Sequence, residues 1–317
     1  MYNKIYNTLL GEKDIDVFEF IKSVDSWMYY QWIVEMFYLP QSIGTINSKD
    51  EQYLLIRDYC LKQIEANSKI KMLDYGAGKC RIYDCLKING EMINGNIEYE
   101  AFEPKPEDNY EYDENIRLYS RADEIMDNRY NIIILLNVLH EIPVTEWRDV
   151  FKKIGAALVE DGKLIFIEVK NLSHGEQPYG DNGFLILNDE AVSICFPKAQ
   201  KISMDNQKSN AWVINKSSLN NIDSVDIINA IERLQESCKK ELYNVYHERI
   251  NIAREENKID VSMKARKYAF ISQQYINSKF AIDILKESRI SREVSKESHK
   301  KMKTSITPPP INRKDKI

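Results

Sequence analysis

The feature that most constrains the fold is residues 70–81, which read Ile-Lys-Met-Leu-Asp-Tyr-Gly-Ala-Gly-Lys-Cys-Arg. An apolar run ends in Asp74, two glycines follow at Gly76 and Gly78, and apolar residues then recur at helical spacing. This pattern predicts a strand that passes through a tight glycine turn into a helix. Glycine lets such a turn approach a ligand closely, and the helix directs unpaired N–H groups at that ligand. An ordinary turn is the alternative interpretation, because glycine occurs in turns of every kind.

The chain after this turn alternates between strand-like and helix-like patterns. Strands are predicted over residues 97–103, 116–119, 130–136 and 163–169, with a helix over residues 144–159. Glu103 ends the second strand, 25 residues after Gly78, near the spacing at which dinucleotide folds place a carboxylate on ribose hydroxyls. Residues 130–136 form a continuous β-branched and leucine run, which is typical of a strand buried on both faces.

The order of these features resembles the class I S-adenosylmethionine-dependent methyltransferases over residues 65–215. Residues 74–78 resemble the first motif of that family, and residues 137–142 resemble the motif after its fourth strand. The resemblance makes Glu103 the ribose acid and Asp123 the acid that contacts adenine. It also implies S-adenosyl-L-methionine as the cofactor, held by Asp74, Tyr75, Gly76, Ala77, Gly78, Glu103, Ala122, Asp123 and Asn137. One departure is Cys80, which stands where the family often has a third glycine.

The fold class implied by the resemblance is α/β, a Rossmann-like, doubly wound and mostly parallel seven-stranded sheet. Residues 201–203 and 211–214 resemble its last two strands, which are antiparallel at the sheet edge in this family. Residues 104–114 are rich in Asp, Glu, Pro and Tyr, so we expect the second crossover helix to be short or lost. Four regions are expected, namely an N-terminal helical cap (1–66), the methyltransferase core (67–216), a C-terminal helical region (217–291) and a basic, disordered tail (292–317).

His140 and Glu141 directly follow the fourth predicted strand, where doubly wound sheets place their ligands. His140 is a candidate general base, and Glu141 is a candidate to orient it or to bind an amine. Alternatively, both residues only end the strand or position the methionine part of the cofactor. Methyl transfer from a sulfonium can proceed by in-line positioning alone, so a base is not a requirement of the reaction.

The methyl acceptor cannot be read from the sequence. An aromatic cluster within residues 27–38 and the polar loop 171–183 are candidate walls of an acceptor site, with helix packing and an ordinary surface loop as the alternatives. We favour a small molecule, with a protein or RNA acceptor second. The helices expected at 217–291 match no motif of the family, and they suggest a homo-oligomer or a protein partner. The second hypothesis is a methyltransferase-like interaction module without turnover that acts through residues 218–290, and the features that allow it are Cys80 and the short second crossover.

Composition excludes several other classes of protein. The formal net charge of −5 gives the whole chain no nucleic-acid signature, although the tail 292–317 holds eight Lys or Arg against three acids. Five cysteines without a Cys-x-x-Cys pair argue against a disulfide framework or a zinc site. With no apolar run of about 18 residues and no signal-peptide pattern, we expect no membrane span and a cytoplasmic location.

Overall fold

The structure is a computed structural model that describes residues 49–67, 69–88, 90, 95–108, 110–170, 185–204, 208–252, 267 and 270–288, with backbone only over 245–252. The predictions for the N-terminal cap helices, the polar loop 171–183 and the basic tail lie outside these residues, apart from the helix that ends the cap.

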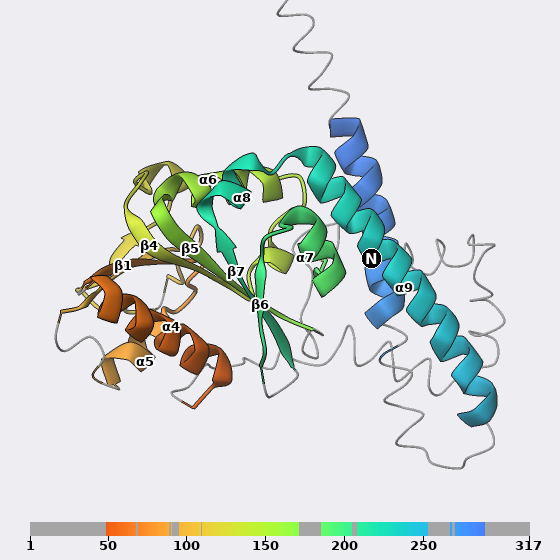
Figure 1. Cartoon of the computed structure of the whole chain (residues 1–317), viewed down its shortest axis with the longest axis horizontal. Helices are drawn as coiled ribbons and strands as arrows, with labels where there is room; N and C mark the ends of the chain where they lie inside the picture. Colours follow the sequence, from red (N-terminus) through yellow and green to blue (C-terminus); the bar gives the residue numbers. More distant parts are fainter. Residues whose placement is uncertain are drawn as a thin grey trace, which may run out of the picture.

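A seven-stranded sheet with the strand order β3-β2-β1-β4-β5-β7-β6 forms the centre of the protein (Figure 1). Strands β1 to β5 pair in parallel, and β7 is antiparallel to both of its neighbours. This arrangement confirms the predicted Rossmann-like α/β fold. The strands are β1 (Ile70–Tyr75), β2 (Ile97–Phe102), β3 (Arg117–Tyr119), β4 (Tyr130–Leu136), β5 (Leu158–Val169), β6 (Gln200–Ile202) and β7 (Ser209–Asn215).

The helices form a layer on each face of the sheet, with α4 and α5 on one side and α6 and α8 on the other (Figure 1). Ile132 and Ile134 of β4 pack in the apolar cluster of α4 and α5, whereas Leu135 packs in the cluster of the other layer. Successive side chains of a strand point to opposite faces, so β4 needs a continuous apolar run. The helices are α4 (Glu51–Asn67), α5 (Arg81–Ile88), η1 (Ala122–Glu124), η2 (Leu139–Glu141), α6 (Trp147–Ala157), α7 (Asp189–Cys195), α8 (Lys216–Asn221) and α9 (Ser224–Ile252).

The C-terminal helices extend the layer that contains α6 and α8. A helical segment at 270–288 lies beside α9 (Figure 1), and the ion pair Lys286–Glu232 joins the two at 2.8 Å. Ile231 of α9 and Ile282 of the segment belong to the same buried cluster as the sheet residues on that face. Helices were predicted at these places, and their apolar stripe is buried against the core.

No helix is present in the described residues between β2 and β3, as predicted. This segment instead lies against the glycine turn that precedes α5. The Tyr112 hydroxyl donates to the Gly78 carbonyl at 3.0 Å, and Lys79 pairs with Glu107 at 3.0 Å. The segment is therefore held against the glycine turn by its own side chains.

A buried carboxylate ties three strands together. Glu100 of β2 accepts hydrogen bonds from the hydroxyls of Tyr119 (2.7 Å) and Tyr130 (2.6 Å) and from Nε of Arg129 (3.2 Å). Burial by itself raises the pKa of Glu100, but the hydrogen bonds from Arg129, Tyr130 and Tyr119 outweigh it and hold that pKa below its usual value. The paired charge is thus a fixed part of the fold.

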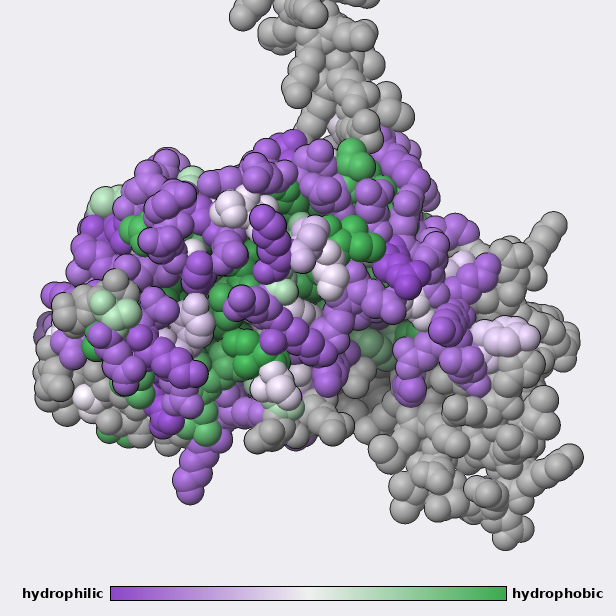
Figure 2. Space-filling view, in the orientation of Figure 1, coloured by the Kyte–Doolittle hydropathy of each residue, from purple (hydrophilic) through white to green (hydrophobic). Residues whose placement is uncertain are grey.

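The surface view in Figure 2 is mostly hydrophilic, with apolar side chains gathered between α4 and β6. Leu55, Ile202 and Met204 are partly buried residues of the cluster on that face. All five cysteines lie in the described part of the chain, where they are buried and form no disulfide. Among the helices that the structure describes, none combines the length and the apolar character needed to cross a bilayer.

Candidate functional site

The turn after β1 has the backbone that a ligand-binding glycine turn requires. Gly76 and Gly78 have φ values of +78° and +50°, in the left-handed region that favours glycine. A methyl group on Gly76 would lie 2.5 Å from Cγ1 of Val138, whereas nothing lies within 4 Å of the same position on Gly78. The N–H groups of Gly76 and Ala77 donate to the Phe102 carbonyl at 2.8 and 3.0 Å. The turn is thus anchored to the end of β2 and open beside Gly78.

Cys80, which differs from the third glycine expected at this position, has a backbone conformation that favours glycine. Its φ is +54°, and its side chain is buried in the cluster under α4 and α5. A left-handed conformation costs a residue with a Cβ about 1–2 kcal/mol. Burial raises the pKa of the Cys80 thiol to about 12, and the charge of Asp74 adds to this effect. The structure therefore accommodates a cysteine at this position by packing its side chain into the core.

Glu103 and the glycine turn lie together at the carboxyl ends of β2 and β1. The Glu103 carboxylate accepts hydrogen bonds from the backbone N–H groups of Gly78 (2.9 Å) and Lys105 (3.1 Å). The Glu103 backbone N–H donates to the Tyr119 carbonyl at 3.0 Å, which fixes the residue at the strand end. The structure therefore brings the predicted ribose acid into contact with the predicted first motif.

Asp74 is a buried carboxyl at the end of β1. Its Oδ2 atom accepts a hydrogen bond from the Tyr99 hydroxyl at 2.7 Å. Burial raises the pKa of Asp74 to about 7, with the hydrogen bond from Tyr99 opposing the shift and the charge of Glu103 adding to it. The carboxyl is therefore protonated at higher pH than an ordinary aspartate, and a nearby cation would favour its ionised form.

The remaining predicted cofactor residues differ in how far they are enclosed. Tyr75 is a core residue whose ring lies 4.6 Å, centroid to centroid, from that of Phe102, and burial raises its pKa to about 12. Ala122 is partly buried on η1. Asp123 is 65% exposed and accepts a hydrogen bond from Nε of Arg121 at 3.0 Å. Ala122 is therefore the more enclosed of the two residues predicted beside adenine.

A buried histidine–carboxylate pair lies where β4 and β5 end. The Nδ1 atom of His140 is 2.7 Å from Oε1 of Glu168, and both side chains are at most 4% exposed. A carboxylate facing Nδ1 selects the tautomer in which Nε2 can accept a proton. Glu141, the residue predicted to orient His140, is exposed. Oε2 of Glu168 is buried and accepts no hydrogen bond from the residues that the structure describes.

Asn137 joins β4 to two other elements. It has a φ of +54°, and its backbone N–H donates to the Ile167 carbonyl at 2.9 Å. Its Nδ2 donates to Oε1 of Gln52 on α4 at 3.2 Å, and Nε2 of Gln52 donates to Oγ of Ser209 on β7 at 2.7 Å. Glu168, Gln52 and Ser209 were not singled out from the sequence. The signal that could have found Glu168 is a lone acid at the end of the fifth apolar run.

The polar loop predicted at the acceptor site is held at its two ends by described residues. The backbone N–H of Lys170, at its start, donates to the Lys208 carbonyl at 2.8 Å. After the loop, the backbone N–H of Ile186 donates to Oε1 of Gln274 at 2.8 Å. One end is thus fixed next to β7 and the other end to the helical segment 270–288.

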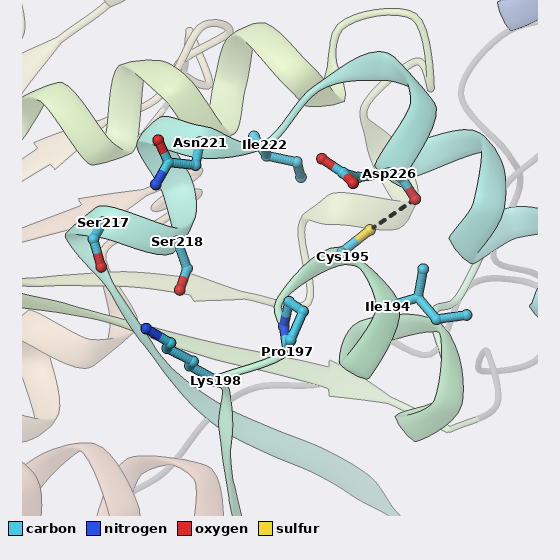
Figure 3. A pocket seen from close by; sticks show the side chains of 9 residues that line it. All are labelled: Ile194, Cys195, Pro197, Lys198, Ser217, Ser218, Asn221, Ile222 and Asp226. Carbon is cyan, nitrogen blue, oxygen red and sulfur yellow. Dashed lines mark hydrogen bonds between the residues drawn. The ribbon is translucent and has the colours of Figure 1, made fainter.

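One cavity lies apart from these residues. A cavity of about 320 Å³ opens at the amino-terminal edge of the parallel strands, between α7, α8 and the start of α9 (Figure 3). It is lined by Ile194, Cys195, Pro197, Lys198, Ser217, Ser218, Asn221, Ile222 and Asp226. None of these residues was predicted to bind or react. In the residues that the structure covers, no cluster of three or more His, Cys, Asp or Glu is arranged to hold a metal ion.

No protein-family model matches the chain, and no curated protein matches it. Among solved structures, a CurJ carbon methyltransferase is 16% identical over 52% of this chain, with a TM-score of 0.41. This chain spans about half of the CurJ chain (54%). A 1,6-didemethyltoxoflavin-N1-methyltransferase from Burkholderia thailandensis, solved with S-adenosylhomocysteine, is 14% identical over 52% of this chain and 77% of its own, with a TM-score of 0.34. The strand order and the antiparallel β7 give this chain a Rossmann-like α/β fold.

Proposed function

We propose that the chain is an S-adenosylmethionine-dependent methyltransferase that acts on a small-molecule acceptor. The observation that carries the proposal is the Glu103 carboxylate 2.9 Å from the Gly78 N–H, at the carboxyl ends of adjacent strands. In doubly wound sheets this is the edge at which nucleotides bind, with the acid on ribose hydroxyls. The open position beside Gly78 lets a ligand approach the backbone closely.

Seven of the nine predicted cofactor-binding residues have a role in this proposal. Gly76 to Gly78 hold the methionine and ribose portions, and Glu103 accepts hydrogen bonds from the ribose hydroxyls. The carboxyl of Asp74 lies behind the turn and is ionised by a cationic ligand. Ala122 and Asp123 frame the adenine. When bound, S-adenosylmethionine supplies a methyl group on a sulfonium, whose carbon–sulfur bond breaks with both electrons going to sulfur.

The buried His140–Glu168 pair suggests that His140 is the general base of this reaction. In this proposal His140, whose Nδ1 lies 2.7 Å from Oε1 of Glu168, takes a proton from the acceptor. The acceptor then forms its new bond to the methyl carbon as it loses that proton. Such a pair suits an acceptor whose reacting atom carries a hydrogen, such as a hydroxyl, an N–H or an activated C–H group. An acceptor without such a hydrogen needs no base.

Two features had favoured an interaction module without turnover, and the structure gives each of them another explanation. Cys80 has a positive φ, as a glycine at this position could, and its thiol is buried. The segment that replaces the second crossover helix packs on the glycine turn through Tyr112, so the turn is supported on that side. Neither feature removes a group that the cofactor needs.

Calorimetric titration with S-adenosylmethionine and S-adenosylhomocysteine tests the proposal. We expect Kd values of about 1–100 μM for the wild-type chain, corresponding to about 5.5–8 kcal/mol. Glu103→Ala is expected to weaken binding by about tenfold or more, because it removes buried hydrogen bonds to the ligand. Glu114→Ala is the matched control, since Glu114 is an exposed acid on the same segment. Absence of binding at millimolar ligand, or equal Kd values for wild type and Glu103→Ala, would contradict the proposal.

A further inference from the structure

A chain of hydrogen bonds connects α4 to the ends of two strands. It runs from Asn137 Nδ2 to Gln52 Oε1 (3.2 Å) and from Gln52 Nε2 to Ser209 Oγ (2.7 Å). Gln52 and Ser209 are 7% and 4% exposed. The start of α4 is itself held, because the Asp50 carboxylate accepts a hydrogen bond from the Gln52 backbone N–H at 2.8 Å. Gln52 is therefore a buried side chain in a fixed position and not a surface residue that happens to reach Asn137.

This chain determines which end of the Asn137 carboxamide is available to a ligand. A carboxamide has one donor end and one acceptor end. The donor end of Asn137 is taken by Gln52, and within the described part of the chain its acceptor end, Oδ1, is buried without a hydrogen bond. A buried acceptor without a partner is costly, which makes it a place where a ligand donor gains affinity.

The position of Asn137 indicates which ligand that is. Asn137 immediately precedes Val138, whose side chain lies against Gly76, where an added methyl group would come within 2.5 Å of it. Asn137 is thus adjacent to the glycine turn and not to the far side of the sheet edge. A donor on the cofactor is closer to this turn than a donor on the acceptor molecule.

We infer that Gln52 is a positioning residue that turns the Asn137 carboxamide so that Oδ1 accepts a hydrogen bond from the α-ammonium group of the cofactor. The inference rests on the proposed function. The ammonium is the donor at the amino-acid end of S-adenosylmethionine, while the ribose hydroxyls are assigned to Glu103. A cationic donor also suits this edge of the sheet, because two buried carboxyl groups, Asp74 and Glu168, lie at the ends of its strands. No bond to carbon or sulfur changes in this step.

Two probes separate the amino-acid end from the rest of the cofactor. S-adenosylhomocysteine carries the amino-acid end, and 5′-methylthioadenosine has the same adenosine and thioether without it. Gln52→Met keeps the length of the side chain and removes its amide. In titration calorimetry we expect this variant to bind S-adenosylhomocysteine about three- to tenfold more weakly than wild type. Its Kd for 5′-methylthioadenosine should stay within about twofold of the wild-type value.

The rescue variant is Gln52→Glu, whose carboxylate can still accept the Asn137 Nδ2 hydrogen and so keeps Oδ1 available. It is expected to restore S-adenosylhomocysteine binding to within about threefold of wild type. Gln63→Met is the matched control on the same helix, 11 residues further on. It should leave both affinities unchanged. If Gln52→Met does not fold, Ser209→Ala removes the far end of the hydrogen-bond chain, and about a twofold selective loss for S-adenosylhomocysteine is expected.

The outcomes separate the inference from the proposed function. If neither probe binds the wild-type chain, the proposed function fails. If both probes bind and Gln52→Met weakens them equally, Gln52 has only a structural role. If it weakens neither of them, Asn137 Oδ1 does not contact the amino-acid end. Either of the last two results overturns the inference and leaves the proposed function standing.

Discussion

Replacing Asp74 with asparagine is expected to stabilise the ligand-free protein. The gain in the free energy of unfolding should increase as the pH rises. Burial raises the pKa of the folded-state carboxyl to about 7, against an ordinary value of 3.8. Between these values the unfolded chain carries an ionised Asp74 while the folded chain carries the protonated form. Folding then takes up a proton, so the contribution of Asp74 to stability falls as the pH rises through this window.

The size of the effect follows from the shift. From 3.8 to about 7 the shift amounts to about 4 kcal/mol, at about 1.36 kcal/mol per pKa unit. This penalty is absent at low pH, where both states are protonated, and constant above the folded-state pKa. Asparagine has nearly the same shape, and its carbonyl can still accept the Tyr99 hydroxyl, now 2.7 Å from Oδ2. The substitution therefore removes the cost of the charge with little change in packing.

Urea denaturation followed by circular dichroism, from about pH 5 to about pH 8, measures this difference. The free energy of unfolding of Asp74→Asn, minus that of wild type, should grow by about 1.4 kcal/mol per pH unit up to about pH 7. Asp123→Asn is the control, because the hydrogen bond from Arg121 lowers the pKa of that exposed carboxyl. Its difference from wild type should stay constant over the same range. A constant difference for Asp74→Asn as well would refute the reasoning.

Three further predictions concern the same site. Gly76→Ala is expected to lower the free energy of unfolding by about 3 kcal/mol, and Gly78→Ala by about 1 kcal/mol. Both positions have a positive φ, but only a methyl group on Gly76 would clash with Val138. Equal losses in chemical denaturation would contradict this prediction. His140→Gln is expected to reduce kcat by about 10²- to 10⁴-fold without changing the Kd for S-adenosylhomocysteine, and an unchanged kcat would remove the base. Binding of S-adenosylmethionine near neutral pH is expected to release a proton from Asp74, seen as a dependence of the calorimetric heat on the buffer and absent from Asp74→Asn.

The strands could be predicted because a parallel strand covered on both faces requires a continuous apolar run. The predicted fourth strand, 130–136, matches β4 residue for residue. The apolar run of the first strand stops at Leu73, yet β1 continues through Asp74 and Tyr75. It continues because the Tyr99 hydroxyl and the Phe102 ring provide partners for those two side chains. Local pattern therefore identified the strands but not all of their ends.

The partners at the site could not be predicted because strand pairing brings them together. Leu136 pairs with Ile167, and this register puts Glu168 next to the residues that follow β4. His140 and Glu168 are 28 positions apart, and Gln52 and Ser209 are 157 positions apart. In a sequence, a single acid after an apolar run or a glutamine near a helix start is unremarkable. Only the sheet order makes either of them a neighbour of the site.

Lys170 and Ile186, the described residues on either side of the polar loop 171–183, are held by different parts of the protein. Lys170 is held by the Lys208 backbone, and Ile186 is held by the Gln274 side chain, so neither attachment uses the stretch between them. The entropy of closing a loop grows only slowly with its length, so this stretch can change in length and composition at little cost to the scaffold. If this stretch holds the acceptor, replacing it between these two points would change the preference for an acceptor and leave the residues proposed to hold the cofactor unchanged.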